Sequence, residues 1–198
     1  MLIAFEGGEG TGKSTQARLL AERLGALLTF QPGATAIGVA IRRVLLDPAT
    51  AGLDPRAEAL LMAADRAQHV AEVIRPALDA GRVVVTDRYV DSSVAYQGYG
   101  RQLGAQAVAE LSAFATGGLR ADLVVLLRVP PAVRDERLAT RGGLDRLEQA
   151  GTAFHERVEA GFAALAAANP DRWVVLDGDA AVEVVAARVW DAVSPHLP

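Results

Sequence analysis

A short glycine-rich stretch near the start of the chain constrains its fold more than any other feature. Residues 7–14 read Gly-Gly-Glu-Gly-Thr-Gly-Lys-Ser, which fits the P-loop pattern G-x-x-x-x-G-K-[ST]. A P-loop requires a buried strand before it and a helix after it. An apolar run at 2–5 precedes the motif, and leucine and alanine recur at helical spacing from Ser14 until Gly25. This context favours a phosphate-binding loop over a chance glycine-rich turn.

The only lysine of the chain, Lys13, lies inside this motif. The chain has 20 lysine and arginine residues, and all the others are arginines. A compact ammonium on a thin, flexible stem reaches the β- and γ-phosphates through a tight ring of amides, whereas a guanidinium is planar and wider. We therefore expect Lys13 to bind a nucleoside triphosphate. The other triphosphate contacts expected from the loop are Gly7, Gly8, Glu9, Gly10, Thr11, Gly12, Ser14 and Thr15.

Composition excludes several classes of protein. A length of 198 residues with 51% hydrophobic and 22% charged residues predicts one globular domain over 1–198. No apolar run approaches the ~20 residues of a membrane span, and the first residues lack the basic segment of a signal peptide. The absence of cysteine fits a cytoplasmic location. A net charge of −4 argues against nucleic-acid binding through a broad basic face.

Five short apolar runs alternate with helical patterns along the chain. Because these runs lack polar–apolar alternation, they predict strands buried on both faces of a parallel sheet. The runs lie at 2–5, 26–30, 83–86, 123–127 and 173–176. Further helices are predicted at 35–47, 56–80, 104–116, 131–141, 152–168 and 180–193. The predicted fold is an α/β P-loop three-layer sandwich, a five-stranded parallel sheet with helices on both faces, which binds ligands at the carboxyl ends of its strands.

Two other segments carry phosphate chemistry. Asp87 ends the third apolar run, where a carboxylate beside the P-loop suits Mg²⁺, with the Ser14 hydroxyl as a second ligand. Arg88 would then face phosphate, and the alternative is an ordinary surface Asp–Arg pair.

Further on, two glycines interrupt an arginine-rich helical stretch, which predicts a lid at about 141–152. Arg141 and Arg146 would neutralise transferring phosphate from this lid; the alternative is a solvated, charged loop.

Six further stretches form a recognisable set. They are Phe-Glu-Gly at 5–7, Ala-Asp-Arg-Ala-Gln-His at 64–69, Asp-Arg-Tyr at 87–89, Ser-Ser-Val-Ala-Tyr-Gln-Gly-Tyr-Gly-Arg at 92–101, Asp-Arg-Leu-Glu at 145–148 and Phe-His-Glu-Arg-Val at 154–158. Together they resemble bacterial thymidylate kinases over residues 5 to about 162, and more weakly to the end of the chain. The block at 87–101 is specific to that family, whereas a P-loop alone occurs in many.

The resemblance implies a nucleoside monophosphate kinase that transfers the γ-phosphate of ATP to dTMP, giving dTDP. It also implies Mg²⁺ as cofactor and a homodimer joined by helices. Some members of the family carry a catalytic arginine within the P-loop, where this chain has Gly10. The chain therefore resembles the type that supplies this arginine from the lid. The catalytic residues implied are Lys13, Arg88, Arg141 and Arg146, and Arg141 is also expected to contact ATP.

The resemblance also implies an acceptor site. Glu9 matches a carboxylate that meets the 3′-hydroxyl of the acceptor sugar, and Arg66 matches an arginine that binds a thymine carbonyl. Arg88 matches one that bridges the donor and acceptor phosphates. Tyr96 stands where an aromatic ring crowds the 2′-position of the sugar and excludes ribose. Polar groups that line the base pocket are matched by Ser93 and Gln97.

The acceptor side departs from the family pattern at four positions, Phe30, Gln31, Ala34 and Met62. The usual Thr-Arg-Glu-Pro-Gly-Gly-Thr reads Thr-Phe-Gln-Pro-Gly-Ala-Thr at 29–35, so Phe30 replaces an arginine that binds the acceptor phosphate. The lost contact is worth roughly 2–3 kcal/mol. Gln31 lacks a carboxylate, and Met62 stands where a phenylalanine stacks on thymine. The candidates to replace the missing cation are Arg42 and Arg101.

These departures leave two alternatives open. One is a kinase for a different nucleoside or deoxynucleoside monophosphate. The other is a nucleotide-binding regulatory protein with weakened catalysis.

The three histidines, His69, His155 and His196, lack metal-ligand spacing, and we expect them to be structural or solvated.

Overall fold

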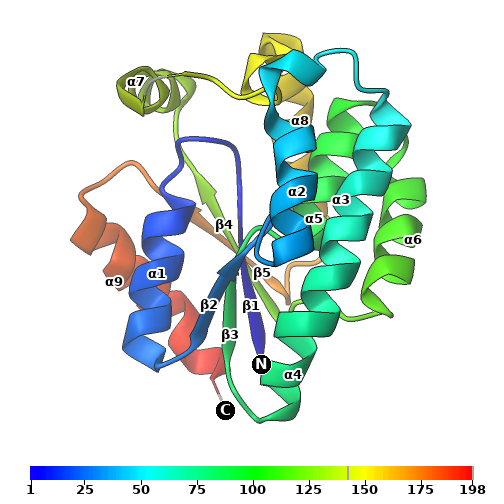
Figure 1. The fold of residues 1–198 in the computed structure, drawn as a ribbon. Helices are drawn as coiled ribbons and strands as arrows, with labels where there is room; N and C mark the ends of the chain where they lie inside the picture. The colour runs from blue at the N-terminus through cyan, green and yellow to red at the C-terminus, as the bar shows by residue number, and fades with distance from the viewer. Residues whose placement is uncertain (142, 198) are drawn as a thin grey trace.

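Five parallel strands form one sheet, with helices on both sides of it (Figure 1). This computed structural model describes residues 1–141 and 143–197 of the chain, and of Arg141 it describes the backbone alone. The strand order is β2-β3-β1-β4-β5. The strands are β1 (Leu2–Glu6), β2 (Leu27–Phe30), β3 (Val84–Asp87), β4 (Leu123–Arg128) and β5 (Trp173–Asp177). The predicted fold class is confirmed, and every strand lies within one residue of its predicted bounds.

The helices follow the predicted segments with one exception. They are α1 (Lys13–Leu24), α2 (Ala36–Leu46), α3 (Pro55–His69), α4 (Arg75–Asp79), α5 (Val90–Ser93), α6 (Ala105–Thr116), α7 (Pro131–Arg141), α8 (Thr152–Ala168) and α9 (Val182–Val193). Short 3₁₀ turns lie at Pro48–Thr50, Glu148–Ala150 and Ser194–His196, and a π-helical turn at Val70–Ile74 joins α3 to α4. Among the described residues, none of these helices is both long and apolar enough to cross a bilayer.

The exception is the segment from Val90 to Gly100, for which the sequence predicted no helix. The structure has α5 here, continued by a π-helical turn at Val94–Gly100. Glycine is a poor helix former, but here it allows close packing against α8. A Cβ on Gly100 would lie 2.7 Å from Cε2 of Phe154, and one on Gly161 would lie 2.9 Å from the ring of Tyr99. Contact with α8 therefore stabilises a helix that local propensity alone does not predict.

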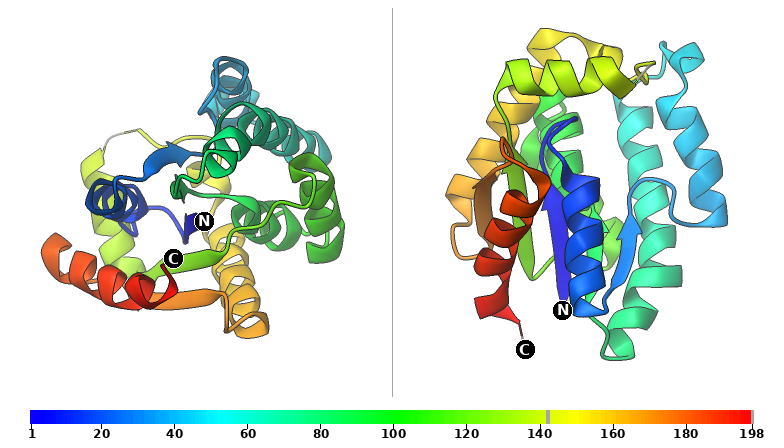
Figure 2. Two further views of the ribbon diagram at one scale, coloured as in Figure 1. Left: turned by 90° about the horizontal axis from the view of Figure 1, so that it is seen from below. Right: turned by 90° about the vertical axis from the view of Figure 1, so that its left-hand side faces the viewer.

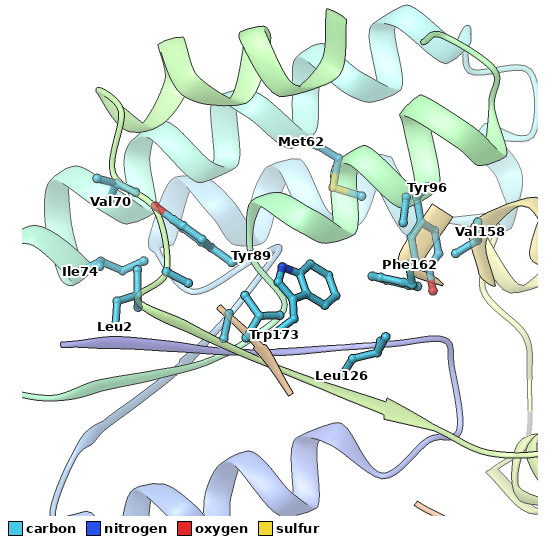
Figure 3. Packing of buried hydrophobic residues seen from close by; sticks show 14 of the residues in the cluster. Leu2, Met62, Val70, Ile74, Tyr89, Tyr96, Leu126, Val158, Phe162 and Trp173 are labelled. Carbon is cyan, nitrogen blue, oxygen red and sulfur yellow. The ribbon is translucent and has the colours of Figure 1, made fainter. Parts of the chain in front are cut away.

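Both faces of the sheet are buried, which explains the uninterrupted apolar strands. Leu2 and Ala4 of β1 belong to one core cluster, and Ile3 and Phe5 belong to the other. The first cluster lies under α2, α3, α5 and α8, and the second under α1 and α9 (Figures 1 and 2). Figure 3 shows part of the first cluster, in which aromatic side chains fill the space between the sheet and its helices.

The register of the sheet sets the position of the site. Phe5 of β1 pairs with Asp87 of β3, and Asp87 pairs in turn with Phe30 of β2. The carboxyl ends of these three strands therefore lie side by side, directly before the P-loop, the 88–100 segment and the 31–35 loop. Helix α7 crosses above the P-loop at this same edge (Figure 2). The contact is direct, since the Arg137 guanidinium donates to the carbonyl of Gly10 at 3.2 Å.

Candidate active site

The P-loop has the geometry that phosphate binding requires. Gly7, Gly10 and Gly12 have φ values of 135°, 71° and 91°, a region in which only glycine is unstrained. They turn the chain sharply into α1, whose first residue is Lys13. The Lys13 ammonium is buried and donates to the Gly8 carbonyl at 2.5 Å. Burial, with Arg88 nearby, lowers the pKa of Lys13 to about 8. The lone lysine thus lies inside the loop, as predicted.

Ser14 and Asp87 meet at the mouth of this loop. The Ser14 hydroxyl donates to Oδ2 of Asp87. The other oxygen, Oδ1, is buried and has no hydrogen-bond partner among the described residues. A hydroxyl next to a carboxylate with spare acceptor capacity suits Mg²⁺, which takes few protein ligands and completes its shell with waters and substrate phosphates. The predicted metal ligands are therefore brought together, and their chemistry fits the ion.

Arg88 joins the two sequence motifs. Its φ is 68°, unusual for a residue other than glycine, and its guanidinium turns back toward the P-loop. It donates to the carbonyl of Gly7 at 3.0 Å and pairs with the carboxylate of Glu9. The Tyr96 hydroxyl lies 3.1 Å from both Arg88 and Glu9. These three polar groups form one cluster at the centre of the site.

A buried carboxylate that the sequence analysis did not assign to the site, Glu6, supports this cluster. It ends β1 and accepts hydrogen bonds from the amide of Tyr89 at 2.9 Å and from the amide and hydroxyl of Ser92 at 3.2 and 2.5 Å. Burial, reinforced by the charge of Asp91, raises its pKa to about 7. Glu6 therefore fixes the backbone of Tyr89 and Ser92, the segment that directly follows Arg88. The only signal in the sequence is a carboxylate ending an otherwise apolar strand.

One cavity of about 340 Å³ connects the P-loop to a pocket between β2, α3 and the 88–97 segment. Lys13, Ser14 and Asp87 line its phosphate-binding end. All the residues predicted for the acceptor site line it as well: Glu9, Phe30, Met62, Arg66, Arg88, Ser93, Tyr96 and Gln97. The volume is in the range of pockets that bind small ligands. The donor and acceptor motifs, distant in sequence, thus face a single space.

Comparison with known proteins agrees with this arrangement. The family model described as thymidylate kinase matches residues 5–189. The chain belongs to the thymidylate kinase family. A protein named thymidylate kinase from Synechococcus sp. (strain JA-2-3B'a(2-13)) is 50% identical, over 100% of this chain and 96% of its own length. One from Deinococcus radiodurans is 47% identical, over 98% and 96%. The crystal structure of thymidylate kinase from Ehrlichia chaffeensis superposes with a TM-score of 0.80 at 30% identity, covering 98% of both chains.

Against the usual thymidylate kinase pattern, Gln31 is accommodated by a buried hydrogen-bond network. Its amide oxygen accepts from Nε of Arg66 at 2.8 Å, and its amide nitrogen lies 2.8 Å from Nδ1 of His69. Nε2 of His69 lies 2.6 Å from the hydroxyl of Thr29. Burial, with Arg66 nearby, lowers the pKa of His69 to about 4, so Nδ1 is free to accept from the amide. The amide that stands in place of the family's glutamate therefore has a partner for its oxygen and another for its nitrogen.

Of the two candidates to replace the cation lost at Phe30, the structure favours Arg42. The Arg42 guanidinium lies 5.9 Å from the centre of the Phe30 ring, lines the cavity, and donates to the Pro32 carbonyl at 2.6 Å. Arg101 instead pairs with Glu58 at 3.0 Å and stacks 4.5 Å above the ring of Phe154. Arg101 is not among the residues that line the cavity.

The lid prediction needs a correction at Arg146. The sequence placed this arginine at the phosphates, but its side chain is 5% exposed and pairs with Glu58 at 2.7 Å. It also donates to the Leu45 carbonyl at 2.8 Å. Held between Glu58 and Leu45, Arg146 is not among the residues that line the cavity in this arrangement. The predicted role of Arg141 concerns a side chain outside the described residues. Arg137, an arginine of the same stretch that was given no site role from the sequence, joins Arg88 in contacting the P-loop.

Proposed function

We propose that this protein is a thymidylate kinase that transfers the γ-phosphate of ATP to dTMP and releases ADP and dTDP. The observation that carries the proposal is the shared cavity, in which the P-loop lysine and the acceptor-site residues face one space. Phosphoryl transfer needs two nucleotides held in line with water excluded, and it needs no covalent intermediate. A pocket continuous with the P-loop supplies that geometry.

On the donor side, Lys13 and the loop amides would hold the β- and γ-phosphates. Ser14 and Asp87 would hold Mg²⁺, which when bound neutralises and orients the phosphate oxygens. Arg88, already between the P-loop and Tyr96, would bridge the γ-phosphate and the acceptor phosphate. Arg137 and Arg141 of α7 would add positive charge from above the loop, in a lid at about 141–152.

On the acceptor side, Arg66 would read a carbonyl of the base. Its guanidinium is buried and held by the Tyr89 carbonyl at 3.1 Å and the Ser93 hydroxyl at 3.0 Å. Glu9 would accept a hydrogen bond from the 3′-hydroxyl of the sugar. Tyr96, whose ring is fixed edge-on against Phe154 and Phe162, would exclude a 2′-hydroxyl. Arg42 would bind the acceptor phosphate in place of the arginine lost at Phe30.

A homodimer is part of the proposal. The side chain of Phe114 on α6 is 89% exposed, and Leu60 on the neighbouring α3 is 58% exposed. Exposed large apolar side chains on adjacent helices are typical of a protein interface. Sedimentation should give a dimer for the native chain and a monomer for Phe114→Asp.

A cytoplasmic location, where ATP is abundant, stays a prediction.

A coupled assay of ADP release across dTMP, dUMP, UMP, CMP and AMP tests the function. We expect the highest kcat/KM with dTMP. A faster reaction with a ribonucleotide would contradict the thymidylate assignment and favour the alternative of another monophosphate kinase. ATP binding without transfer to any acceptor would favour the regulatory alternative.

A further inference from the structure

Gln97 ends in a side-chain amide whose two sides have different surroundings. It lines the acceptor cavity, and its side chain is 1% exposed. The amide nitrogen donates to Oε1 of Glu58 at 2.9 Å. The amide oxygen is buried and has no hydrogen-bond partner among the described residues. A buried acceptor without a partner is costly unless a ligand satisfies it, and because Gln97 lines the cavity, we infer that the missing donor belongs to the bound nucleotide.

The orientation of this amide follows from the chemistry of Glu58. Glu58 is fully buried and pairs with Arg101 at 3.0 Å and Arg146 at 2.7 Å. Guanidinium groups only donate, and Arg101 reaches Oε1 at 3.3 Å as well as Oε2 at 3.0 Å, so both oxygens of Glu58 act as acceptors. A carboxylate held in this way can face only the nitrogen of a neighbouring amide. Gln97 therefore cannot turn over to present its nitrogen in place of its oxygen.

A fixed acceptor at this point discriminates between pyrimidine bases. Thymine and uracil carry a hydrogen on N3 and can donate, whereas N3 of cytosine is an unprotonated acceptor. Two facing acceptors leave both groups unsatisfied, and buried sites of this kind reject the mismatched ligand strongly. If Gln97 were free to turn, its nitrogen could donate to cytosine instead, and most of this discrimination would be lost.

We propose that Glu58 is a specificity-determining residue, which locks the Gln97 amide with its oxygen toward the base and so selects pyrimidines that carry an N3 hydrogen. The inference rests on the proposed function, because it takes the cavity to be the dTMP site. It gives Arg146 a different role from the one expected of a lid arginine. Together with Arg101, Arg146 keeps Glu58 an acceptor.

The test compares dTMP with 5-methyl-dCMP, which differ only at the C4 substituent and the N3 hydrogen. Calorimetric Kd values are measured for the full chain and for Glu58→Gln, in which residue 58 can donate and allow Gln97 to turn. We expect Glu58→Gln to lower the preference for dTMP by about tenfold or more. Part of the preference should remain, because Arg66 would still favour the base that carries a carbonyl. The matched control is Arg101→Gln, which removes one guanidinium from Glu58 but keeps the Gln97–Glu58 bond. It should leave the preference unchanged, even if it lowers stability.

An unchanged preference in Glu58→Gln, an equal loss in Arg101→Gln, or a native chain that binds both nucleotides equally would each overturn the inference. If Glu58→Gln does not fold because two guanidinium groups lose their counter-charge, the double variant Glu58→Gln/Arg101→Gln is compared with Arg101→Gln alone. Turnover is measured separately. Selective binding of dTMP without phosphorylation would overturn the proposed function and leave the inference standing.

Discussion

The donor and acceptor halves of the cavity are built in different ways. The donor half consists mainly of eight consecutive residues, whose backbone amides and single lysine are placed by glycine turns. The acceptor half draws its side chains from β2, α3 and the 88–97 segment, and buried hydrogen-bond networks hold them. The donor half retains the pattern of its family, whereas the acceptor half departs from it at four positions. A site held by networks can absorb a substitution by rearranging partners, and a backbone loop cannot.

A single substitution in the donor half should therefore abolish phosphoryl transfer. Lys13→Ala should leave the fold intact and lower kcat by at least about 10³-fold, because Lys13 is the only lysine of the chain and its ammonium lies inside the loop. Lys13→Arg should fail nearly as badly, since a planar guanidinium does not fit there. Steady-state kinetics with ATP and dTMP, alongside circular dichroism, measure both. The steric argument is wrong if Lys13→Arg keeps more than about a tenth of kcat, equivalent to ~1.4 kcal/mol of barrier.

The two halves also differ in how far the sequence predicts them. Lys13, Ser14 and Asp87 line the same end of the cavity, and their proximity could be predicted because a contiguous motif and one strand tip define it. The hydrogen-bond pairs that hold the acceptor side chains in place were not predicted, because the two members of each pair lie far apart along the chain. Gln97 and Glu58 are 39 residues apart, and Gln31 and His69 are 38 apart. No local pattern marks such pairs.

The same limit applies to the position of Arg146, which lies against Glu58 and not at the predicted phosphate site. The break in the arginine-rich stretch correctly suggested a loop above the sheet, and Arg137 next to it does reach the P-loop. Which arginine turns toward phosphate depends on where buried carboxylates lie, however, and Glu58 is contributed by a different helix. The helix over 90–100 was missed for a related reason, since contacts with α8 and not local propensity stabilise it.

Two arginines of the lid region should behave differently when replaced. Arg141→Ala should lower kcat by roughly 10²-fold with a smaller change in ATP affinity, as expected of a charge that stabilises the transition state. Arg146→Ala should instead destabilise the fold by about 2–4 kcal/mol, because it removes one partner of a buried ion pair. Urea denaturation and kinetics on both variants separate the effects. Arg18→Ala, in an exposed pair with Glu22, serves as the control for stability and should cost less than about 1 kcal/mol. A normal fold with a 10²-fold loss of kcat in Arg146→Ala would restore the original assignment.

Glu6 lies beneath the junction of the two halves and should make stability depend on pH. Its pKa is raised from 4.5 to about 7 in the folded chain, so folding takes up a proton between these values. The stability contributed by this group is complete below pH 4.5 and is lost as the pH rises through 7. From pH 5 to 8, the free energy of unfolding should fall by about 2 kcal/mol relative to Glu6→Gln. Denaturant titrations at each pH measure this difference, and Glu22→Gln is the exposed control. Parallel pH profiles for the native chain and Glu6→Gln would show that Glu6 is ionised in the fold.

The smallest effect is expected at Phe30, where the acceptor half has already compensated. Restoring the family's arginine with Phe30→Arg would add a cation at the tip of β2, and the full contact would lower KM for dTMP by roughly 30–150-fold. Because Arg42 lies against Phe30 at the cavity wall, we expect only about a threefold gain, with KM for ATP unchanged. Arg42→Gln should raise KM for dTMP in the native background, and less so when Phe30→Arg is also present. That non-additivity identifies a shared phosphate contact. If Phe30→Arg gives the full gain and Arg42→Gln changes nothing, Arg42 does not replace the lost arginine. The acceptor half would then bind dTMP more weakly because of Phe30, whereas the donor half keeps all of its phosphate contacts.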